Sequence, residues 1–284
     1  MDDSKRLASQ NIEPTVVESF GREWQRFDQS GTSHSELREI FEQYFSVFPW
    51  EKLSADAVGF DLGCGTGRWA AFVAPLVSEL HCIDPSAALE VARRNLSHLP
   101  NCRLHHASVD SMPLADGSAD FGYSIGVLHH VPDTAGAIAD CARKLKPGAP
   151  LLLYLYYAFD NRPFWFRVLW KGSDLVRRIV SRLPWRCRHL IADLIAAFVY
   201  WPFARLSALF ERARVCVDRV PLSSYRTRSF YVMRNDALDR FGTRLEKRFS
   251  RDEIKQMMVD AGLEHIAFRN SAPFWCAVGY QKLS

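Results

Sequence analysis

An aspartate followed by closely spaced glycines is the stretch of this sequence best suited to chemistry. Residues 60–68 read Phe-Asp-Leu-Gly-Cys-Gly-Thr-Gly-Arg, with Asp61 two places before the first of three alternating glycines. Glycines permit backbone conformations closed to other residues and let a ligand touch the main chain. Dinucleotide-binding turns read G-x-G-x-x-G, whereas this turn reads G-x-G-x-G. The anion at Asp61 suits a positively charged ligand better than a pyrophosphate.

A second carboxylate, Asp84, follows the glycine loop at the end of the next predicted strand. The apolar stretch 79–83 predicts a strand, and Asp84 comes directly after it, 21 residues beyond Gly63. A carboxylate at the end of the second strand of a parallel sheet can accept both hydroxyls of a ribose. Pro85 is placed to cover one face of an adenine. The sequence therefore predicts a cofactor that carries a nucleoside.

The run from Asp61 to Gly67 resembles the first motif of the class I S-adenosylmethionine-dependent methyltransferases, in particular the small bacterial type 11/25 domains. In that family the loop wraps the methionine part of the cofactor, whose sulfonium is cationic. The resemblance implies S-adenosyl-L-methionine as cofactor and implies contacts to it from Asp61, Gly63, Cys64, Gly65, Gly67, Asp84, Pro85, Ser108, Val109, Gly126 and Val127.

The adenine contact departs from the family pattern. Family members often have an acidic residue followed by a small one after the third strand, and Ser108 and Val109 occupy those positions here. Serine stands here in place of the expected carboxylate, so the contact to the adenine amine differs from the family pattern, whereas a backbone contact at Val109 survives any side chain. Asp110 is the alternative acceptor.

The end of the predicted fourth strand is the place for an acid–base group. The string Asp120-Phe121 followed six residues later by Leu128-His129-His130 also resembles the family. Histidines titrate near neutrality, so His129 or His130 could take a proton from the methyl acceptor. Adjacent histidines point differently, so one of them is expected to pack or hydrogen-bond. Tyr156 and Tyr157 either line the acceptor pocket or belong to the core.

The resemblance implies an α/β fold with a Rossmann-like seven-stranded methyltransferase sheet and helices on both faces. We expect an N-terminal helical lid over 1–50, a cofactor-binding core over 51–158, a helical insertion after the fifth strand over 159–248, and a C-terminal helix and strands over 249–284. In the lid, Phe20 and Trp24 lie at helical spacing, in a Phe-Gly-x-Glu-Trp string that resembles the N-terminal helix of small bacterial methyltransferases.

The insertion differs in charge from the rest of the chain. It holds 19 Lys and Arg against 8 Asp and Glu, a net charge of +11 in a chain whose total is +4. The stretch 174–183 predicts an amphipathic helix with Leu175, Val176, Ile179, Val180 and Leu183 facing inward and the arginines outward. The apolar run 194–204 is 11 residues long, short of the roughly 20 needed to cross a bilayer.

Three roles for the insertion follow from its composition. It could cap the active site and face the acceptor, it could touch a membrane through its tryptophans and arginines, or it could bind nucleic acid, for which no recognised pattern is present. The seven cysteines of the whole chain lie far apart in sequence. This spacing favours neither a zinc site nor a set of disulfides, and we expect no metal. We expect a cytoplasmic protein, with peripheral membrane contact through the insertion left open.

The resemblance therefore implies a methyltransferase that acts on a small-molecule, lipophilic or secondary-metabolite acceptor. An RNA or protein methyltransferase that uses the basic insertion is the first alternative. A catalytically silent cofactor-binding scaffold subunit is the second, and the intact glycine loop with Asp84 argues against it.

Overall fold

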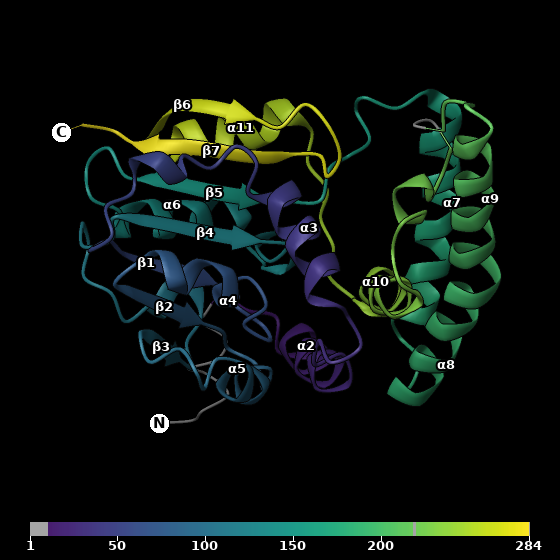
Figure 1. The fold of residues 1–284 in the computed structure, drawn as a ribbon, viewed down its shortest axis with the longest axis horizontal. Coiled ribbons are helices and arrows are strands. Elements are labelled where there is room, and N and C mark those ends of the chain that lie inside the picture. The colour runs from purple at the N-terminus through teal and green to yellow at the C-terminus, as the bar shows by residue number, and fades with distance from the viewer. Residues whose placement is uncertain (1–10, 218–219, 284) are drawn as a thin grey trace. The chain divides into compact units, whose positions relative to one another are not determined.

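The chain divides into two compact units in the computed structural model, which describes residues 11–217 and 220–283 (Figure 1). The first unit comprises residues 1–29, 37–158 and 245–284, and the second comprises residues 30–36 and 159–244. Residues 1–10 of the expected lid and Ser284 lie outside the described part. The second unit corresponds closely to the insertion expected over 159–248.

The first unit is built on a seven-stranded sheet in the order β3-β2-β1-β4-β5-β7-β6. The strands from β1 to β5 pair in parallel, and β7 runs antiparallel to both β5 and β6. This is the predicted methyltransferase sheet. Its strands are β1 Val58–Leu62, β2 Glu79–Ile83, β3 Cys102–His105, β4 Phe121–Ile125, β5 Pro150–Tyr154, β6 Leu263–Phe268 and β7 Cys276–Gln281.

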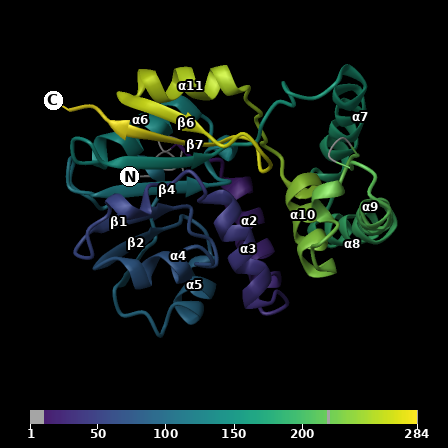
Figure 2. The same cartoon turned by 45° about the horizontal axis from the view of Figure 1, so that its top comes forward.

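Helices cover both faces of this sheet, because its strands are apolar on both sides (Figure 2). One core lies between the sheet and α6 and α11, and the other lies between the sheet and α3, α4 and α5. The helices of this unit are α2 Pro14–Arg26, α3 His34–Tyr44, which begins in the second unit, α4 Ala70–Val73, α5 Leu89–Asn95, α6 Thr134–Lys144 and α11 Arg251–Asp260. The predicted capping box at Ser250 and Glu253 opens α11.

The second unit is helical and contains α7 Phe164–Val180, α8 Trp185–Ile195, α9 Trp201–Arg212 and α10 Phe230–Gly242. A π-helical turn over Ala196–Tyr200 joins α8 to α9 without a break, so the two form one 28-residue helix. This joined helix has a mean hydropathy of 1.4 and is long and apolar enough to cross a bilayer on length and composition. The expectation of a segment too short to span was wrong, because the helix continues through polar residues on either side of the apolar run.

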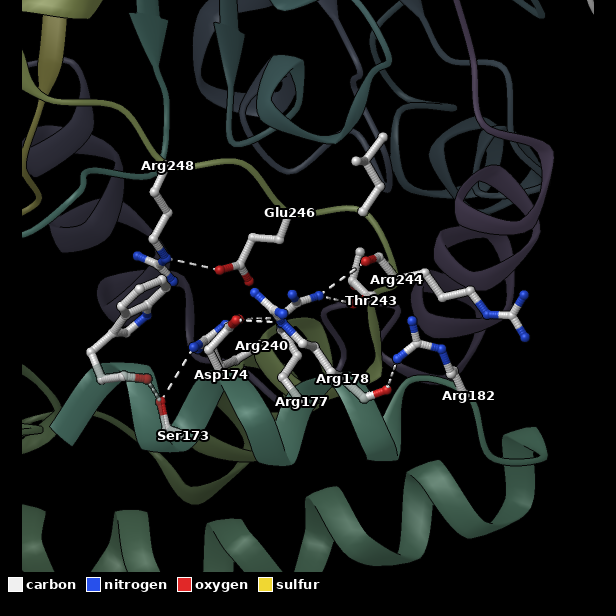
Figure 3. Close-up of polar contacts among 12 residues, drawn as sticks. Ser173, Asp174, Arg177, Arg178, Arg182, Arg240, Thr243, Arg244, Glu246 and Arg248 are labelled. Atoms are coloured by element: carbon white, nitrogen blue, oxygen red, sulfur yellow. Dashed lines mark hydrogen bonds and ion pairs between the residues drawn. The ribbon is translucent and has the colours of Figure 1, made fainter. Parts of the chain in front are cut away.

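The orientation of α7 also corrects the sequence-based expectation. Its buried residues are Asp174, Arg177 and Val180, whereas Leu175, Val176 and Ile179 are exposed. Figure 3 shows Arg177 directed at Asp174 and at the backbone of Thr243. The helix therefore buries the Asp174–Arg177 pair together with Val180, whereas Arg178 and several large apolar residues face outward.

Candidate functional site

The glycine loop lies at the carboxyl end of β1 and adopts backbone angles that its glycines allow. Gly63, Gly65 and Gly67 have φ values of +75°, +54° and +76°. A side chain on Gly63 would meet Val127 at 2.3 Å, so the loop passes directly against the residue that follows Gly126. The loop, Gly126 and Val127 are therefore neighbours, as the sequence predicted for the methionine side of the site. Cys64 is buried in the same loop.

Asp84 is positioned by the loop that it faces. One carboxylate oxygen accepts a hydrogen bond from the Gly65 amide at 2.9 Å. The other accepts from the Ser86 amide at 2.8 Å and from the Ser86 hydroxyl at 2.6 Å. Burial raises the pKa of Asp84, and these donors partly oppose that shift. The side chain at the end of β2 thus links the glycine loop to the turn after Pro85.

Asp61 is a buried carboxylate with unused acceptor capacity. Its Oδ2 has no hydrogen-bond partner among the residues that the structure describes. Burial raises the pKa of Asp61 to about 8, the neighbouring Tyr123 hydroxyl opposes the shift, and Asp84 adds to it. A buried carboxyl in this condition favours a donor or a cation beside it. The site therefore fits the positively charged ligand predicted from the sequence.

The N-terminal helix α2 covers this loop. The indole nitrogen of Trp24 lies 3.4 Å from the position that a side-chain carbon on Gly65 would occupy. The guanidinium of Arg68 lies 4.9 Å from the Trp24 ring centroid. Phe20, one turn before Trp24, packs on His130 with ring centroids 4.9 Å apart. Phe20 and Trp24 thus lie beside the glycine loop and His130, and their role as a lid over the cofactor stays a prediction.

The residues expected near the adenine form a tight turn after β3. Ser108 and Val109 are buried. The Ser108 hydroxyl donates to Asp110, whose other carboxylate oxygen accepts from the Asn11 amide at 3.0 Å. Asp110 is therefore held by protein groups, which weakens the case for it as the adenine acceptor.

The two histidines after β4 have different surroundings. The His129 side chain is 0% exposed, stacks on Tyr156 at 3.8 Å, and has no hydrogen-bond partner on either ring nitrogen within the described part of the chain. Burial, followed by His130 and Arg248, holds its pKa well below the ordinary value. His130 has its Nδ1 2.6 Å from the carbonyl of Leu245. Since a carbonyl only accepts, Nδ1 carries the proton and Nε2 is the acceptor nitrogen.

Tyr156 and Tyr157 face different neighbours. Tyr156 packs on both histidines, and its ring centroid is 5.7 Å from that of His130. Tyr157 packs on Phe274 at 5.5 Å, beside the core under α11. Of the two tyrosines, only Tyr156 lies with the histidines.

The segment that follows the second unit supplies a residue that the sequence did not predict. Arg248 lies over the Tyr156 ring at 5.0 Å and pairs with Glu246 at 2.8 Å. The Lys247 amide donates to the His129 carbonyl at 3.0 Å, which fixes this segment against the end of β4. The cluster of arginines in the sequence hid this position, since nothing distinguished Arg248 from its neighbours.

These residues fit S-adenosylmethionine. The glycine loop has the positive φ angles that let a ligand meet its main chain, the orphaned oxygen of Asp61 suits a donor or cation, and Asp84 and Val109 lie at the ends of the next two strands. The histidine pair, Tyr156 and Arg248 form a separate cluster at the end of β4.

The comparisons agree with this geometry. A family model described as a methyltransferase domain matches residues 60–153. A ubiquinone biosynthesis O-methyltransferase from Aromatoleum aromaticum is 28% identical over 181 residues, which cover 61% of this chain and 74% of that protein. A 37.1 kDa protein of transposon Tn4556 from Streptomyces fradiae is 38% identical over 97 residues, which cover 33% of this chain and 28% of that protein.

Among solved structures, the complex between the Haloferax volcanii Trm112 methyltransferase activator and a methyltransferase matches with a TM-score of 0.53 and 12% identity, covering 94% of this chain and 100% of that one. This likeness concerns the fold. The chain spans about half the length of several other curated relatives that it matches. The range matched by the family model runs from β1 to β5 and includes the glycine loop.

Proposed function

Because residues 60–153 form a class I S-adenosylmethionine-dependent methyltransferase domain, we propose that this chain transfers the cofactor's methyl group to a hydroxyl of a small lipophilic acceptor. The observation that carries the proposal is the glycine loop joined to Asp84 by the hydrogen bond from Gly65. This hydrogen bond supports the proposal because it links the loop to Asp84, the expected ribose acceptor, at the carboxyl ends of adjacent parallel strands.

The cofactor would be held by residues of the first unit alone. The glycine loop and Asp61 would hold the methionine part, Asp84 the ribose, and Val109 the adenine edge, under the cover of Trp24. When bound, the cofactor would supply a methyl group on a sulfonium, which an acceptor nucleophile takes in line as the neutral thioether leaves. The remaining task of the protein is to align the acceptor and to remove its proton.

His130 is the residue that we assign to that proton. The Leu245 carbonyl holds the proton of its ring on Nδ1, so Nε2 can take one from an acceptor hydroxyl. The acceptor oxygen forms a bond to the methyl carbon as the carbon–sulfur bond breaks. The products are a methyl ether, the neutral thioether of the cofactor and a protonated His130. His129 is fully buried and stacks on Tyr156, so we assign it to packing. The Nε2 of His130 is also buried in the structure, so an acceptor would have to uncover it before it could take the proton.

The acceptor class follows from the groups beside His130. Tyr156 offers an aromatic face, and Arg248 beside it favours an acceptor that becomes anionic when it loses its proton. A phenolic hydroxyl has both properties. The ubiquinone biosynthesis O-methyltransferases among the relatives are named for a lipophilic product, which supports the same class.

Transfer of a labelled methyl group tests the proposal. The purified protein is incubated with S-adenosylmethionine labelled in the methyl group and with apolar phenols, total RNA or a cell protein extract in separate reactions. We expect label only in the phenol reactions, in an ether that resists mild base. Label in RNA or protein instead would favour the alternative acceptors, and cofactor binding without any transfer would favour a scaffold.

The natural acceptor can then be identified by comparing the metabolites of a deletion strain with those of its parent. We expect an unmethylated apolar phenol to accumulate in the deletion strain.

A further inference from the structure

We propose that the helical second unit docks on an anionic lipid bilayer through one apolar face of α7 and of the joined helix Trp185–Arg212. This face is defined here as the docking face. The helices are expected to lie in the interface with their exposed apolar side chains inserted between lipid headgroups. The inference concerns the second unit by itself, and it does not depend on the proposed methyl transfer.

The first observation is where the exposed apolar side chains gather. Of the 22 large hydrophobic side chains exposed in the described residues, 19 lie between Phe164 and Phe230. Phe198 is 74% exposed and Phe164 is 73% exposed. Isolated exposed apolar residues are common on soluble proteins, but a contiguous set on adjoining helices marks a partner.

The second observation is the inverted orientation of α7. Its exposed apolar residues recur at spacings of three and four, which place them in one stripe along the helix: Phe164, Val168, Leu169, Leu175, Val176 and Ile179. Its opposite side buries Arg177, which donates to Asp174 at 2.7 Å and to the Thr243 carbonyl at 2.9 Å. The helix thus buries the Asp174–Arg177 pair and presents this apolar stripe outward. Water disfavours this arrangement, and lipid favours it.

The third observation is that the joined helix repeats the pattern. Its buried line consists of Ala192, Ala196, Tyr200, Ala204 and Ser207, and α8 packs on α10. The π-helical turn adds one residue to that turn of helix, which keeps this line continuous from α8 into α9. The larger residues Leu194, Phe198, Phe203 and Leu206 are exposed.

Charge identifies the partner as an anionic membrane. Arg167, Lys171 and Arg178 are exposed on α7, and Arg182 is exposed just after its end; at helical spacings these cations share one border of the apolar stripe. A row of cations beside an apolar face matches the geometry of helices that lie in a lipid interface, where the cations reach the headgroups. Lipid phosphates complement the net charge of +11 over residues 159–248.

An interfacial position fits better than a spanning one. Asp193 on α8 pairs with Arg234 of α10 at 2.9 Å, so one side of the joined helix stays against a polar partner. A helix that crosses hydrocarbon needs apolar or internally satisfied surfaces all round.

Cosedimentation with lipid vesicles tests the inference, using the full-length protein without cofactor or acceptor. The vesicles contain phosphatidylcholine alone or phosphatidylcholine mixed with phosphatidylglycerol. We expect binding to the mixed vesicles and weaker binding to the neutral ones. The double variant Leu175→Glu with Ile179→Glu should bind on the order of 100-fold more weakly, because two side chains no longer enter the apolar region.

The matched control places the same charges on exposed apolar residues of the first unit, in the double variant Leu76→Glu with Val259→Glu. It should bind vesicles like the parent. The double variant Arg167→Gln with Lys171→Gln should lose about fivefold in affinity per charge on the mixed vesicles and little on the neutral ones. Circular dichroism checks that each variant keeps its helices.

Two results would overturn the inference. The parent protein could fail to sediment with the mixed vesicles, or the two glutamate double variants could bind equally. A parent dimer that the Leu175→Glu, Ile179→Glu variant converts to a monomer, without vesicle binding, would assign the docking face to a second copy of the chain. Vesicle binding by a protein that transfers no methyl group would leave this inference intact and refute the proposed function alone.

Discussion

His129 and His130 are adjacent in sequence, yet only one of them suits proton transfer. His129 is enclosed by Tyr156 and His130, whereas the His130 ring is oriented by the Leu245 carbonyl. We expect His130→Gln to lower kcat about 100-fold or more, in the range of a lost general base, with cofactor affinity unchanged. Steady-state kinetics with an apolar phenol measures the first effect, and calorimetry measures the second.

The matched control is His129→Phe, which retains an aromatic ring against Tyr156. This variant should keep kcat within a few fold of the parent. If His129→Phe loses activity as severely as His130→Gln, then the histidine pair acts as a structural unit and the assignment of the base is wrong.

Asp61 makes cofactor binding depend on pH. Its pKa of about 8 means that the ligand-free protein holds it protonated at neutral pH. A cationic ligand favours the carboxylate, so affinity for S-adenosylmethionine should rise by up to about tenfold per pH unit below that pKa. The same shift makes this group destabilise the ligand-free fold as pH rises from about 4 to 8, because only the unfolded chain ionises freely there.

Calorimetry between pH 6 and pH 8.5 checks this dependence. In Asp61→Asn, the affinity for S-adenosylmethionine should rise less steeply with pH, because this carboxyl no longer ionises. The neutral thioether product serves as the control ligand, since it lacks the sulfonium charge. An equal slope in the parent and in Asp61→Asn would mean that Asp61 does not meet the cationic part of the cofactor.

At the scale of elements, the sheet and the glycine loop were predictable because each of their sequence patterns is compatible with only one local structure. A parallel strand buried on both faces must be apolar throughout, and a loop with three positive φ angles requires glycine. The orientation of α7 was not predictable by the same means. Periodicity shows which side chains share a face, but it does not show which face is packed.

The lid helix α2 yields a prediction about cofactor release. Trp24 lies over Gly65 and under the guanidinium of Arg68. We expect Trp24→Ala to speed cofactor dissociation and weaken binding by about tenfold, because a large aromatic cover is lost. Trp24→Phe, which keeps a ring, should bind nearly as the parent does. Stopped-flow dissociation measures the rate, and an unchanged rate in Trp24→Ala would show that α2 does not close the site.

At the scale of the whole molecule, the two units divide the work. All residues assigned to the cofactor belong to the first unit, and the exposed apolar face belongs to the second. The sequence predicted this division from charge and from the break in strand–helix alternation. It did not predict Arg248, which follows the second unit in the chain and reaches the Tyr156 ring within the first.

Thermal unfolding checks the division. S-adenosylmethionine at about 100 times its Kd should stabilise the first unit by about 2.7 kcal/mol and raise its Tm. Asp174→Asn should lower the Tm of the second unit alone. Burial alone would raise the pKa of Asp174, but the guanidinium of Arg177 holds that pKa below its ordinary value. The ionised carboxyl therefore stabilises the second unit above about pH 4. A cofactor that shifts both transitions equally would contradict the division.

Calorimetric titration of S-adenosylmethionine into the parent protein and into Asp84→Asn tests the central claim most directly. Asp84 is the charged group assigned to the ribose, and it also accepts the Gly65 amide that shapes the loop. We predict one site per chain in the parent and a loss of about 2 kcal/mol in binding free energy in the variant. Absence of binding to the parent, or equal affinity in a correctly folded Asp84→Asn, would contradict the account.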